Sequence, residues 1–142
     1  MCKKYLLNKI KVSENQIYEI STDLESIEKS AVDYENKIKK YFLKRKVCFN
    51  LTLLGLGKDG HTASLFQNNI RKKTKKNVVS VKKKYFSRIS LSLKCINNSK
   101  AIFLWSPGKS KSNIIKKILI DKKFKFPASL LRKENNFLFH SN

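Results

Sequence analysis

The chain has 142 residues, the size of one ordinary domain, and is too short for a second domain to be expected. An apolar fraction of 41% and an aromatic fraction of 11% are typical of folded proteins, so the 30% of charged residues does not indicate disorder. The formal net charge of +22 would by itself favour a nucleic acid or an anionic membrane surface as partner.

The composition of this positive charge favours a solvated surface instead. Lysine supplies almost all of it, whereas recognition of base edges and phosphates favours arginine. The basic residues are spread over the whole length and form no single basic arm. The only arginines are Arg45, Arg71, Arg88 and Arg132. A nucleic-acid binder is therefore the weaker alternative, which a steep salt dependence of binding would reveal.

The cysteines and the first residues indicate a reducing, cytoplasmic location. Cys2, Cys48 and Cys95 are odd in number, widely spaced and without a Cys-x-x-Cys pair, which argues against a disulfide framework and a zinc site. The start of the chain has no uninterrupted apolar core of signal-peptide length, and no later stretch approaches a membrane span. We therefore expect no membrane partner.

The first third of the chain predicts helices. Residues 1–20 suggest a short helix followed by a strand. Residues 27–42 have the pattern of an amphipathic helix, and Thr22 with Glu25 resembles a capping box that would start this helix near Asp23. The apolar side would carry Ile27, Ala31, Tyr34, Ile38, Tyr41 and Phe42. The other side would carry Glu28, Lys29, Glu35, Lys39 and Lys40.

Strands dominate the middle of the chain and predict an α/β fold. Residues 47–55 are nearly all apolar or β-forming and lie between a helix and glycines, so we expect a strand buried on both faces of a parallel sheet. Residues 71–77 predict a polar loop, and residues 77–81 and 88–93 predict two further strands. In the second of these, the inward side would carry Ile89, Leu91 and Leu93, and the outward side Arg88, Ser90 and Ser92.

The last third repeats the order of strand, glycine turn and helix. Residues 101–105 predict a short apolar strand that ends at a Ser-Pro-Gly turn, and residues 111–120 predict a helix. One stripe of this helix would carry Ile114, Ile115, Ile118 and Leu119. Residues 126–142 predict a turn of helix and a last short strand. Residues 1–142 are thus interpreted as a single domain.

The segment "GLGKDGHTASLF" begins at Gly55 and holds three of the four glycines. In an open parallel sheet, ligands bind at the carboxyl ends of strands, where loops lead into helices. Gly55 and Gly57 would let the backbone turn sharply and approach a ligand closely, and Gly60 can adopt dihedrals that a side chain forbids. A helix starting near Thr62 would aim its free amide groups at an anion, with His61 at its mouth. Glycines alone are weak evidence, and a loop histidine commonly has no chemical task.

This segment resembles the signature of the 6-phosphogluconolactonases, which are related in fold to glucosamine-6-phosphate deaminases. Further stretches are similar to the family in the same order, namely "DYENKIKKYF", "RISLSL", "SPGKSK" and "FPASLLRKENNFLF". The deaminases carry Ile-Ala-Phe-Asn-Glu after Asp-Gly-His, where this chain has Thr-Ala-Ser-Leu-Phe. The resemblance therefore favours the lactonase over an amino-sugar phosphate deaminase or isomerase.

The resemblance implies a Rossmann-like α/β fold, with a mostly parallel sheet flanked by helices, and hydrolysis of 6-phospho-D-glucono-1,5-lactone to 6-phosphogluconate. His61 would activate water as general base, at a typical gain of about 10²–10⁴-fold. Asp59 would orient the imidazole or hold a sugar hydroxyl, or serve only as a turn former. Arg88 and Lys109 match the family's contacts to the anionic end of the substrate, and no metal or cofactor is required. The other expected substrate contacts are Gly57 and Gly60.

The resemblance begins part-way into the family's domain. Complete members open with a Gly-Gly-Ser/Thr-Pro phosphate loop and later carry an Asp-Glu-Arg segment. This chain has neither: no Gly-Gly occurs in it, and its first glycine is Gly55. We therefore expect a match to the C-terminal part of the family domain, with N-terminal strands missing and an apolar face or edge left open. Two alternatives stay open: an active lactonase, or an inactive fragment that needs another chain to supply the missing N-terminal half.

Overall fold

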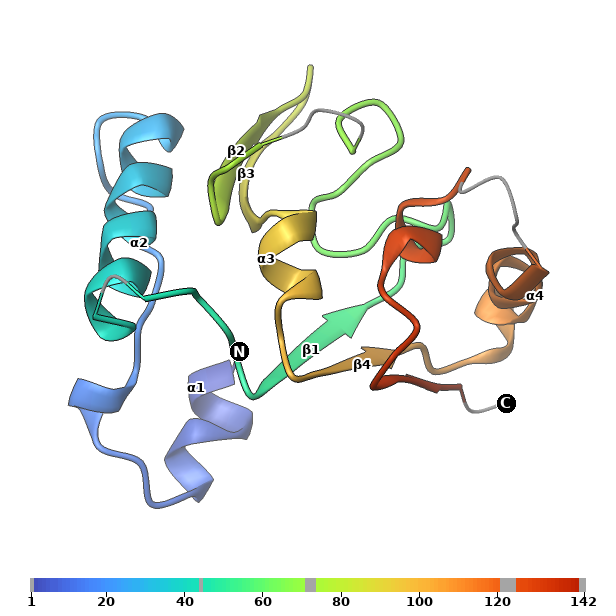
Figure 1. Cartoon of the computed structure of the whole chain (residues 1–142), viewed down its shortest axis with the longest axis horizontal. Helices are drawn as coiled ribbons and strands as arrows, with labels where there is room; N and C mark the ends of the chain where they lie inside the picture. Colours follow the sequence, from blue (N-terminus) through green and yellow to red (C-terminus); the bar gives the residue numbers. More distant parts are fainter. Residues whose placement is uncertain (1, 44, 71–73, 121–124, 141–142) are drawn as a thin grey trace.

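The computed structural model describes residues 2–43, 45–70, 74–120 and 125–140, and it confirms the predicted α/β fold with a parallel sheet (Figure 1). The sheet has the strand order β1 (Leu51–Gly55), β4 (Ala101–Trp105) and β5 (Asn136–Phe139), all parallel. A separate antiparallel hairpin pairs β2 (Val78–Lys82) with β3 (Ser87–Leu91). The helices are α1 (Cys2–Tyr5), α2 (Ile27–Tyr41), α3 (Leu93–Asn97) and α4 (Ser112–Ile120). Single 3-10 turns are η1 (Leu7–Lys9), η2 (Glu14–Gln16), η3 (Lys109–Lys111) and η4 (Pro127–Leu130).

The parallel sheet is covered on one face. Along β1, Thr52 and Leu54 are buried, whereas Leu51 and Leu53 are 53% and 65% exposed. The buried face packs against α3 and α4 in one apolar cluster, whose central members are Leu54, Ile96, Ile102, Leu104, Ile114 and Ile115. The expectation of a β1 strand buried on both faces is therefore wrong, because both helices lie on the same side of the sheet.

The helix α2 starts at Ile27, later than the capping-box pattern indicates. Ser26 has an extended backbone, and its hydroxyl accepts a hydrogen bond from the backbone N–H of Lys29 at 3.2 Å. This bond satisfies one of the free amide groups of the first helical turn. The expected start near Asp23, with Thr22 as the cap, is wrong because Ser26 stands directly before the first helical residue.

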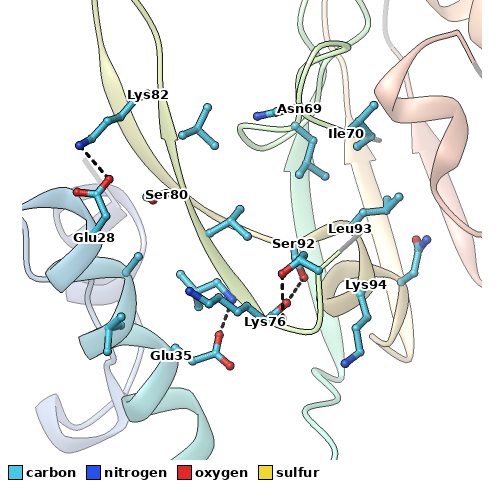
Figure 2. A pocket seen from close by; sticks show the side chains of 18 of the residues that line it. Glu28, Glu35, Asn69, Ile70, Lys76, Ser80, Lys82, Ser92, Leu93 and Lys94 are labelled. Atoms are coloured by element: carbon cyan, nitrogen blue, oxygen red, sulfur yellow. Dashed lines mark hydrogen bonds and ion pairs between the residues drawn. The ribbon is translucent and has the colours of Figure 1, made fainter. Parts of the chain in front are cut away.

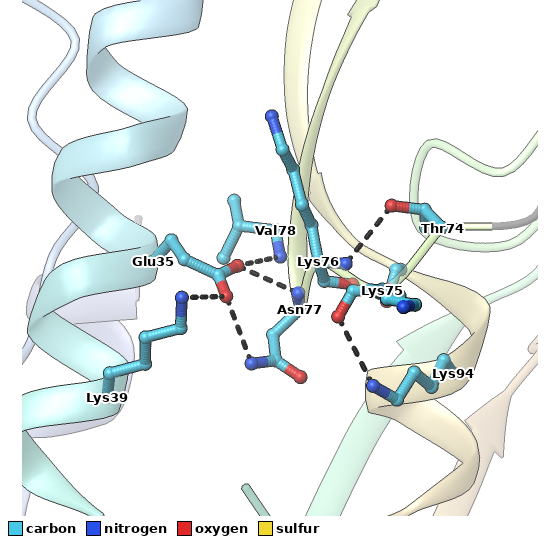
Figure 3. A network of polar contacts seen from close by, with 9 residues as sticks. Glu35, Lys39, Thr74, Lys75, Lys76, Asn77, Val78 and Lys94 are labelled. Atoms are coloured by element: carbon cyan, nitrogen blue, oxygen red, sulfur yellow. Dashed lines mark hydrogen bonds and ion pairs between the residues drawn. The ribbon is translucent and has the colours of Figure 1, made fainter. Parts of the chain in front are cut away.

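The buried side of α2 differs from the predicted stripe, most clearly at Glu35 and Tyr41. Ala31 and Ile38 are buried as predicted, and the helix packs on β2 and β3. Glu35 was expected to face solvent but is 7% exposed, because its carboxylate binds amide groups at the start of β2 (Figure 3). Tyr41 was expected on the apolar side and is 61% exposed. Polarity alone therefore misassigns both residues.

The strand expected over "RISLSL" is shorter than predicted and gives way to α3. It ends at Leu91, and the hydroxyl of Ser92 accepts from the backbone N–H of Cys95 at 3.2 Å, which caps the helix. Ser90 and Ser92 were expected to point outward, but they are 5% and 1% exposed. Ser90 is buried because its hydroxyl accepts from the backbone N–H of Ser64 at 3.1 Å.

The remaining expectations are confirmed only in part. The strand at residues 101–105 is followed by the Ser-Pro-Gly turn and α4, and the tail forms η4 and β5. Leu119, expected on the buried stripe of α4, is 69% exposed. Residues 2–20 form α1, η1 and η2, so the strand expected there is wrong. In the polar loop, residues 71–73 lie outside the described residues, and residues 74–77 belong to no helix or strand.

Candidate active site

The signature segment forms a tight turn at the carboxyl end of β1. The backbone N–H of Gly57 donates to the carbonyl of His61 at 2.8 Å, and the N–H of Gly60 donates to the carbonyl of Gly57 at 3.0 Å. Gly60 has φ +80°, and a Cβ atom there would lie 2.8 Å from the ring of Phe126. The carbonyl of Gly60 accepts from the N–H of Ala128 at 3.0 Å. The turn is thus closed by its own backbone and seated on η4.

This turn brings together the two residues predicted to be catalytic. The Nδ1 atom of His61 lies 2.5 Å from Oδ1 of Asp59. The imidazole also packs against the ring of Phe66, with 4.7 Å between the centroids. A Cβ atom on Gly57 would lie 2.2 Å from Nδ1, so only glycine leaves room for the ring in this position. The imidazole keeps 27% of its side-chain surface exposed, which leaves it accessible from solvent.

The ionisation of Asp59 decides which ring nitrogen of His61 carries the proton. Partial burial acts to raise the pKa of Asp59, but hydrogen bonds from the side chain and backbone of His61 outweigh it, and the net pKa is below its ordinary value. Asp59 is therefore ionised at neutral pH and can only accept a hydrogen bond. In the neutral imidazole the proton must then lie on Nδ1, so the lone pair on Nε2 is free to accept a proton.

The helix expected to start near Thr62 is absent from the described structure. The hydroxyl of Thr62 donates to the carbonyl of Gly55 at 2.8 Å, and isolated bridges pair Thr62 with Leu56 and with Leu65. The side chain of Thr62 is fully buried, and Ala63 has φ +50°. Buried pairing and a left-handed residue stop a helix at this point. The expectation of a row of free helical amide groups above the turn is therefore wrong.

Arg88 reaches the same region through a row of aromatic rings. Its guanidinium lies 4.6 Å from the centroid of Phe86, which lies 5.9 Å from the centroid of Phe66, the ring that contacts His61. The ammonium of Lys83 lies 4.9 Å from the centroid of Phe66. Sequence reasoning missed Lys83, although its place beside the aromatic pair in "KKKYF" was an available signal. The hairpin thus places Lys83 against the ring that contacts His61, and Arg88 one ring further away.

The lysine that contacts the signature turn differs from the predicted one. Lys109 is exposed in η3, the turn that follows β4. Lys111, two residues later, is partly buried, and its ammonium donates to the carbonyl of Leu56 at 2.6 Å. This bond ties the turn after β4 to the segment between Gly55 and Gly57. Sequence reasoning missed Lys111, because one lysine among so many carries no distinguishing signal.

The structure also contains a cavity, and Lys83 is among the residues that line it. It has a volume of about 1140 Å³ and lies between α2, β2, α3 and residues 65–70 (Figure 2). Glu28 and Lys82 form an ion pair of 3.0 Å across its rim. None of the predicted site residues lines it. The candidate site lies at the end of β1, and its chemistry rests on the His61 and Asp59 pair.

Comparison with known proteins identifies the family. A family model described as glucosamine-6-phosphate isomerases/6-phosphogluconolactonase matches residues 1–139. The chain belongs to this family. A putative 6-phosphogluconolactonase of Caenorhabditis elegans is 35% identical over 77% of this chain and 44% of the relative. The probable 6-phosphogluconolactonase 1 of Arabidopsis thaliana is 32% identical over 97% of this chain and 58% of the relative.

The glucosamine-6-phosphate isomerase/6-phosphogluconolactonase family also supplies similar solved structures. The crystal structure of 6-phosphogluconolactonase from Thermotoga maritima has a TM-score of 0.80 and 26% identity, covering 97% of this chain and 61% of that chain. The chain spans about half the length of the curated relatives it matches. No helix among the described residues is long and apolar enough to cross a membrane.

Proposed function

We propose that this chain carries the catalytic turn of a cytoplasmic 6-phosphogluconolactonase, which hydrolyses 6-phospho-D-glucono-1,5-lactone to 6-phosphogluconate. The observation that carries the proposal is the 2.5 Å contact between Nδ1 of His61 and Asp59. A neutral imidazole oriented by a carboxylate, with its second nitrogen free, is the arrangement that a general base requires. Membership of the family and the names of its relatives support the choice of substrate.

The proposed reaction needs only a water molecule and the imidazole. Nε2 of His61 takes a proton from water while the water oxygen bonds to the lactone carbonyl carbon, and the carbonyl oxygen becomes an oxyanion. When this intermediate collapses, the bond from the carbonyl carbon to the ring oxygen breaks. The proton on Nε2 passes to the departing oxygen, which becomes a hydroxyl group. The new carboxylic acid then releases its proton to solvent.

The cations around the turn are assigned to the negative charges of the substrate. Arg88 on the hairpin and Lys109 in η3 are proposed to bind the phosphate or the developing oxyanion. Gly57 and Gly60 are proposed to let the substrate approach the backbone of the turn. Lys111 holds the carbonyl of Leu56 and acts on the turn as a positioning residue.

Rates of lactone hydrolysis above the spontaneous rate test the proposal. We expect His61→Ala to lower kcat by about 10²–10⁴-fold, since it removes the general base. Asp59→Asn should lower kcat at least about tenfold, because an amide no longer fixes the tautomer of His61. Asp23→Asn, in an exposed aspartate before α2, is the matched control and should leave kcat unchanged.

Three results would count against this function. Equal rates for the parent and a folded His61→Ala variant, both above the spontaneous rate, would remove the imidazole from the mechanism. Equal effects of Asp59→Asn and Asp23→Asn would reduce the aspartate to a turn former. Release of ammonia from glucosamine 6-phosphate, without lactone hydrolysis, would assign the chain to the isomerase branch of the family description.

A further inference from the structure

The second histidine of the chain lies at the end of the last strand, and both of its ring nitrogens have hydrogen-bond partners. β5 ends at Phe139, which pairs in register with Trp105 at the end of β4. The next residues along the two strands are His140 and Ser106. Nδ1 of His140 lies 2.7 Å from the carbonyl oxygen of Ser106, and Nε2 lies 2.9 Å from the hydroxyl oxygen of Ser112. The imidazole is therefore fixed at both nitrogens.

These two contacts decide which nitrogen of His140 carries the proton. A backbone carbonyl can only accept a hydrogen bond, so Nδ1 must donate to Ser106. In the neutral ring, Nε2 then holds the lone pair and accepts from the hydroxyl of Ser112. Ser106 is 1% exposed, and its own N–H donates to the carbonyl of Phe139 at 2.9 Å. The anchor of the ring is therefore itself held by β5 and shielded from water.

The two partners of the ring are the first and last residues of one short segment. We call residues 106–112 the lysine turn, and it contains the Ser-Pro-Gly sequence, η3 and the first residue of α4. A serine hydroxyl beside an oriented histidine is also the arrangement of a nucleophile and its base. Here, however, the group that orients the imidazole and the hydroxyl that it accepts from belong to the same turn. The ring therefore joins the two ends of the lysine turn.

The composition of the lysine turn makes a single conformation costly in entropy. Gly108 has φ +90°, and a Cβ atom there would meet no described atom within 4 Å, so packing does not fix this residue. Glycine loses more conformational freedom on folding than any other residue. Fixing the long side chains of Lys109 and Lys111 costs further entropy. Hydrogen bonds at both ends of the turn offset part of this cost before any ligand binds.

We propose that His140 is a positioning residue that preorganises the lysine turn for the anionic end of the substrate. The proposal rests on the proposed lactonase function, in which Lys109 binds the phosphate or the developing oxyanion. Lys111 of the same turn donates to the carbonyl of Leu56 at 2.6 Å, so the turn also contacts the segment that leads to His61. His140 acts through these two lysines and does not itself touch the substrate.

Amide hydrogen exchange and histidine NMR test the role of the ring without any substrate. The N–H of Lys111 donates to the carbonyl of Gly108 at 3.1 Å, and the N–H of Ser112 donates to the carbonyl of Lys109. His140→Phe keeps an aromatic ring and removes both hydrogen bonds, so these two amides should exchange at least about tenfold faster. Proton–nitrogen correlations of the parent should place the imidazole proton of His140 on Nδ1, and the signal should vanish in His140→Phe.

The affinity for 6-phosphogluconate, the product of the proposed reaction, tests the consequence for the site. His140→Phe should raise the Kd of 6-phosphogluconate at least about fivefold, because a loose turn has to be ordered when the anion binds. His140→Gln keeps one donor and one acceptor on a single side chain, so its Kd should stay within about twofold of the parent value. Isothermal titration calorimetry measures the Kd of each protein.

Thr52→Val is the matched control for the loss of a hydrogen bond elsewhere in the same sheet. The hydroxyl of Thr52 lies 2.7 Å from the hydroxyl of Ser99, and both residues are buried at the amino ends of β1 and β4. The control should lower the Tm, because it leaves a buried hydroxyl unpaired. It should leave the Kd of 6-phosphogluconate and the exchange of the Lys111 amide unchanged, since it lies at the opposite end of the strands.

The outcomes separate the role of His140 from the proposed function. Unchanged exchange of the turn amides in His140→Phe, or an imidazole proton on Nε2 of His140, would overturn the proposal. Equal losses of affinity in His140→Phe and Thr52→Val would also overturn it, because the effect would then follow stability alone. If the parent neither binds 6-phosphogluconate nor hydrolyses the lactone, the proposed function fails. The exchange and NMR results then still decide whether His140 fixes the lysine turn.

Discussion

Two regions of the molecule differ in which side chains they bury. One is the helix and hairpin unit, formed by α2, β2 and β3, and the other is the parallel sheet. In the helix and hairpin unit, even a carboxylate is buried, and Glu35 is satisfied by the backbone N–H groups of Asn77 and Val78 at 2.8 and 2.6 Å (Figure 3). In the sheet, Leu53 and Trp105 stay at the surface. Burial is therefore decided by the neighbours that the fold supplies and not by the polarity of a side chain.

The largest expected effect tests how firmly the helix and hairpin unit depends on its buried carboxylate. Glu35 accepts three hydrogen bonds from Asn77 and Val78 and pairs with Lys39 at 3.2 Å. Glu35→Ala would leave buried donors unpaired, so we expect a loss of about 4 kcal/mol in the free energy of unfolding. Chemical denaturation measures it. Glu25→Ala is the matched control, because that carboxylate is 79% exposed and should cost under about 1 kcal/mol.

Equal losses in the free energy of unfolding for Glu35→Ala and Glu25→Ala would contradict the difference drawn between the two regions. They would mean that Glu35 behaves as a surface charge, and that its contacts to the hairpin contribute no more than an exposed ion pair. The helix and hairpin unit would then be held by its apolar cluster alone, which comprises Ala31, Ile38, Val47, Val78 and Cys95.

Two adjacent leucines in β1 test the difference between the faces of the sheet. Leu54 is 9% exposed and packs in the main apolar cluster, so Leu54→Ala should cost about 3 kcal/mol. Leu53 is 65% exposed, so Leu53→Ala should cost under about 1 kcal/mol in the isolated chain. Thermal and denaturant unfolding measure both. A large loss from Leu53→Ala would show that the isolated chain already covers the face of the sheet that carries Leu53, for example by self-association.

The pH dependence of stability sharpens the contrast, because it reports on Cys95 of α3, a buried thiol that packs against the helix and hairpin unit. Burial raises the pKa of Cys95 to about 11 from an ordinary value of 9.0, and the charge of Glu35 acts in the same direction. Its contribution to stability is complete below the unfolded pKa and is lost as the pH rises toward the folded pKa. We expect a loss on the order of 2 kcal/mol between about pH 9 and pH 11.

The Cys95→Ala variant isolates this effect. Burial also raises the pKa of Tyr34, which therefore contributes in the same direction. The pH dependence of the parent's stability alone does not assign the loss to Cys95. Unfolding measured across this pH range should show a shallower decline for Cys95→Ala than for the parent. Parallel curves for the two proteins would mean that the thiol ionises without cost in the folded chain.

The fold was predictable from sequence where local pattern decides the structure. The strand at residues 101–105, its Ser-Pro-Gly turn and α4 follow from an apolar run, a breaker and helical periodicity, and all three are confirmed. The burial of Glu35 and Ser90 was not predictable, because each side chain satisfies a backbone amide that is distant in sequence. The apolar run of β1 predicted burial on both faces, because such a run does not reveal how many layers cover a strand, whereas the family resemblance predicted an apolar face or edge left open.

In the candidate site, too, contacts between neighbours in the sequence were predictable and contacts made by tertiary packing were not. The contact between Asp59 and His61 joins residues two positions apart, so the signature segment alone brings them together. The cations near the turn arrive through tertiary packing: Arg88 by way of the rings of Phe86 and Phe66, and Lys111 through its bond to the carbonyl of Leu56. Among so many lysines, composition gives no means of choosing the one that the fold brings to the turn.

The smallest expected effect concerns the start of α2, where the observed cap, Ser26, differs from the predicted one, Thr22. The hydroxyl of Ser26 binds the N–H of Lys29, so Ser26→Ala should cost about 1 kcal/mol in the free energy of unfolding. Thr22→Ala removes the cap that the sequence pattern favoured and should change stability by under about 0.5 kcal/mol, because the helix begins beyond it. Denaturant unfolding of both variants decides between them. If Thr22→Ala were the more costly, α2 would start before Ile27. The helix would then be longer at the end where Glu28 pairs with Lys82.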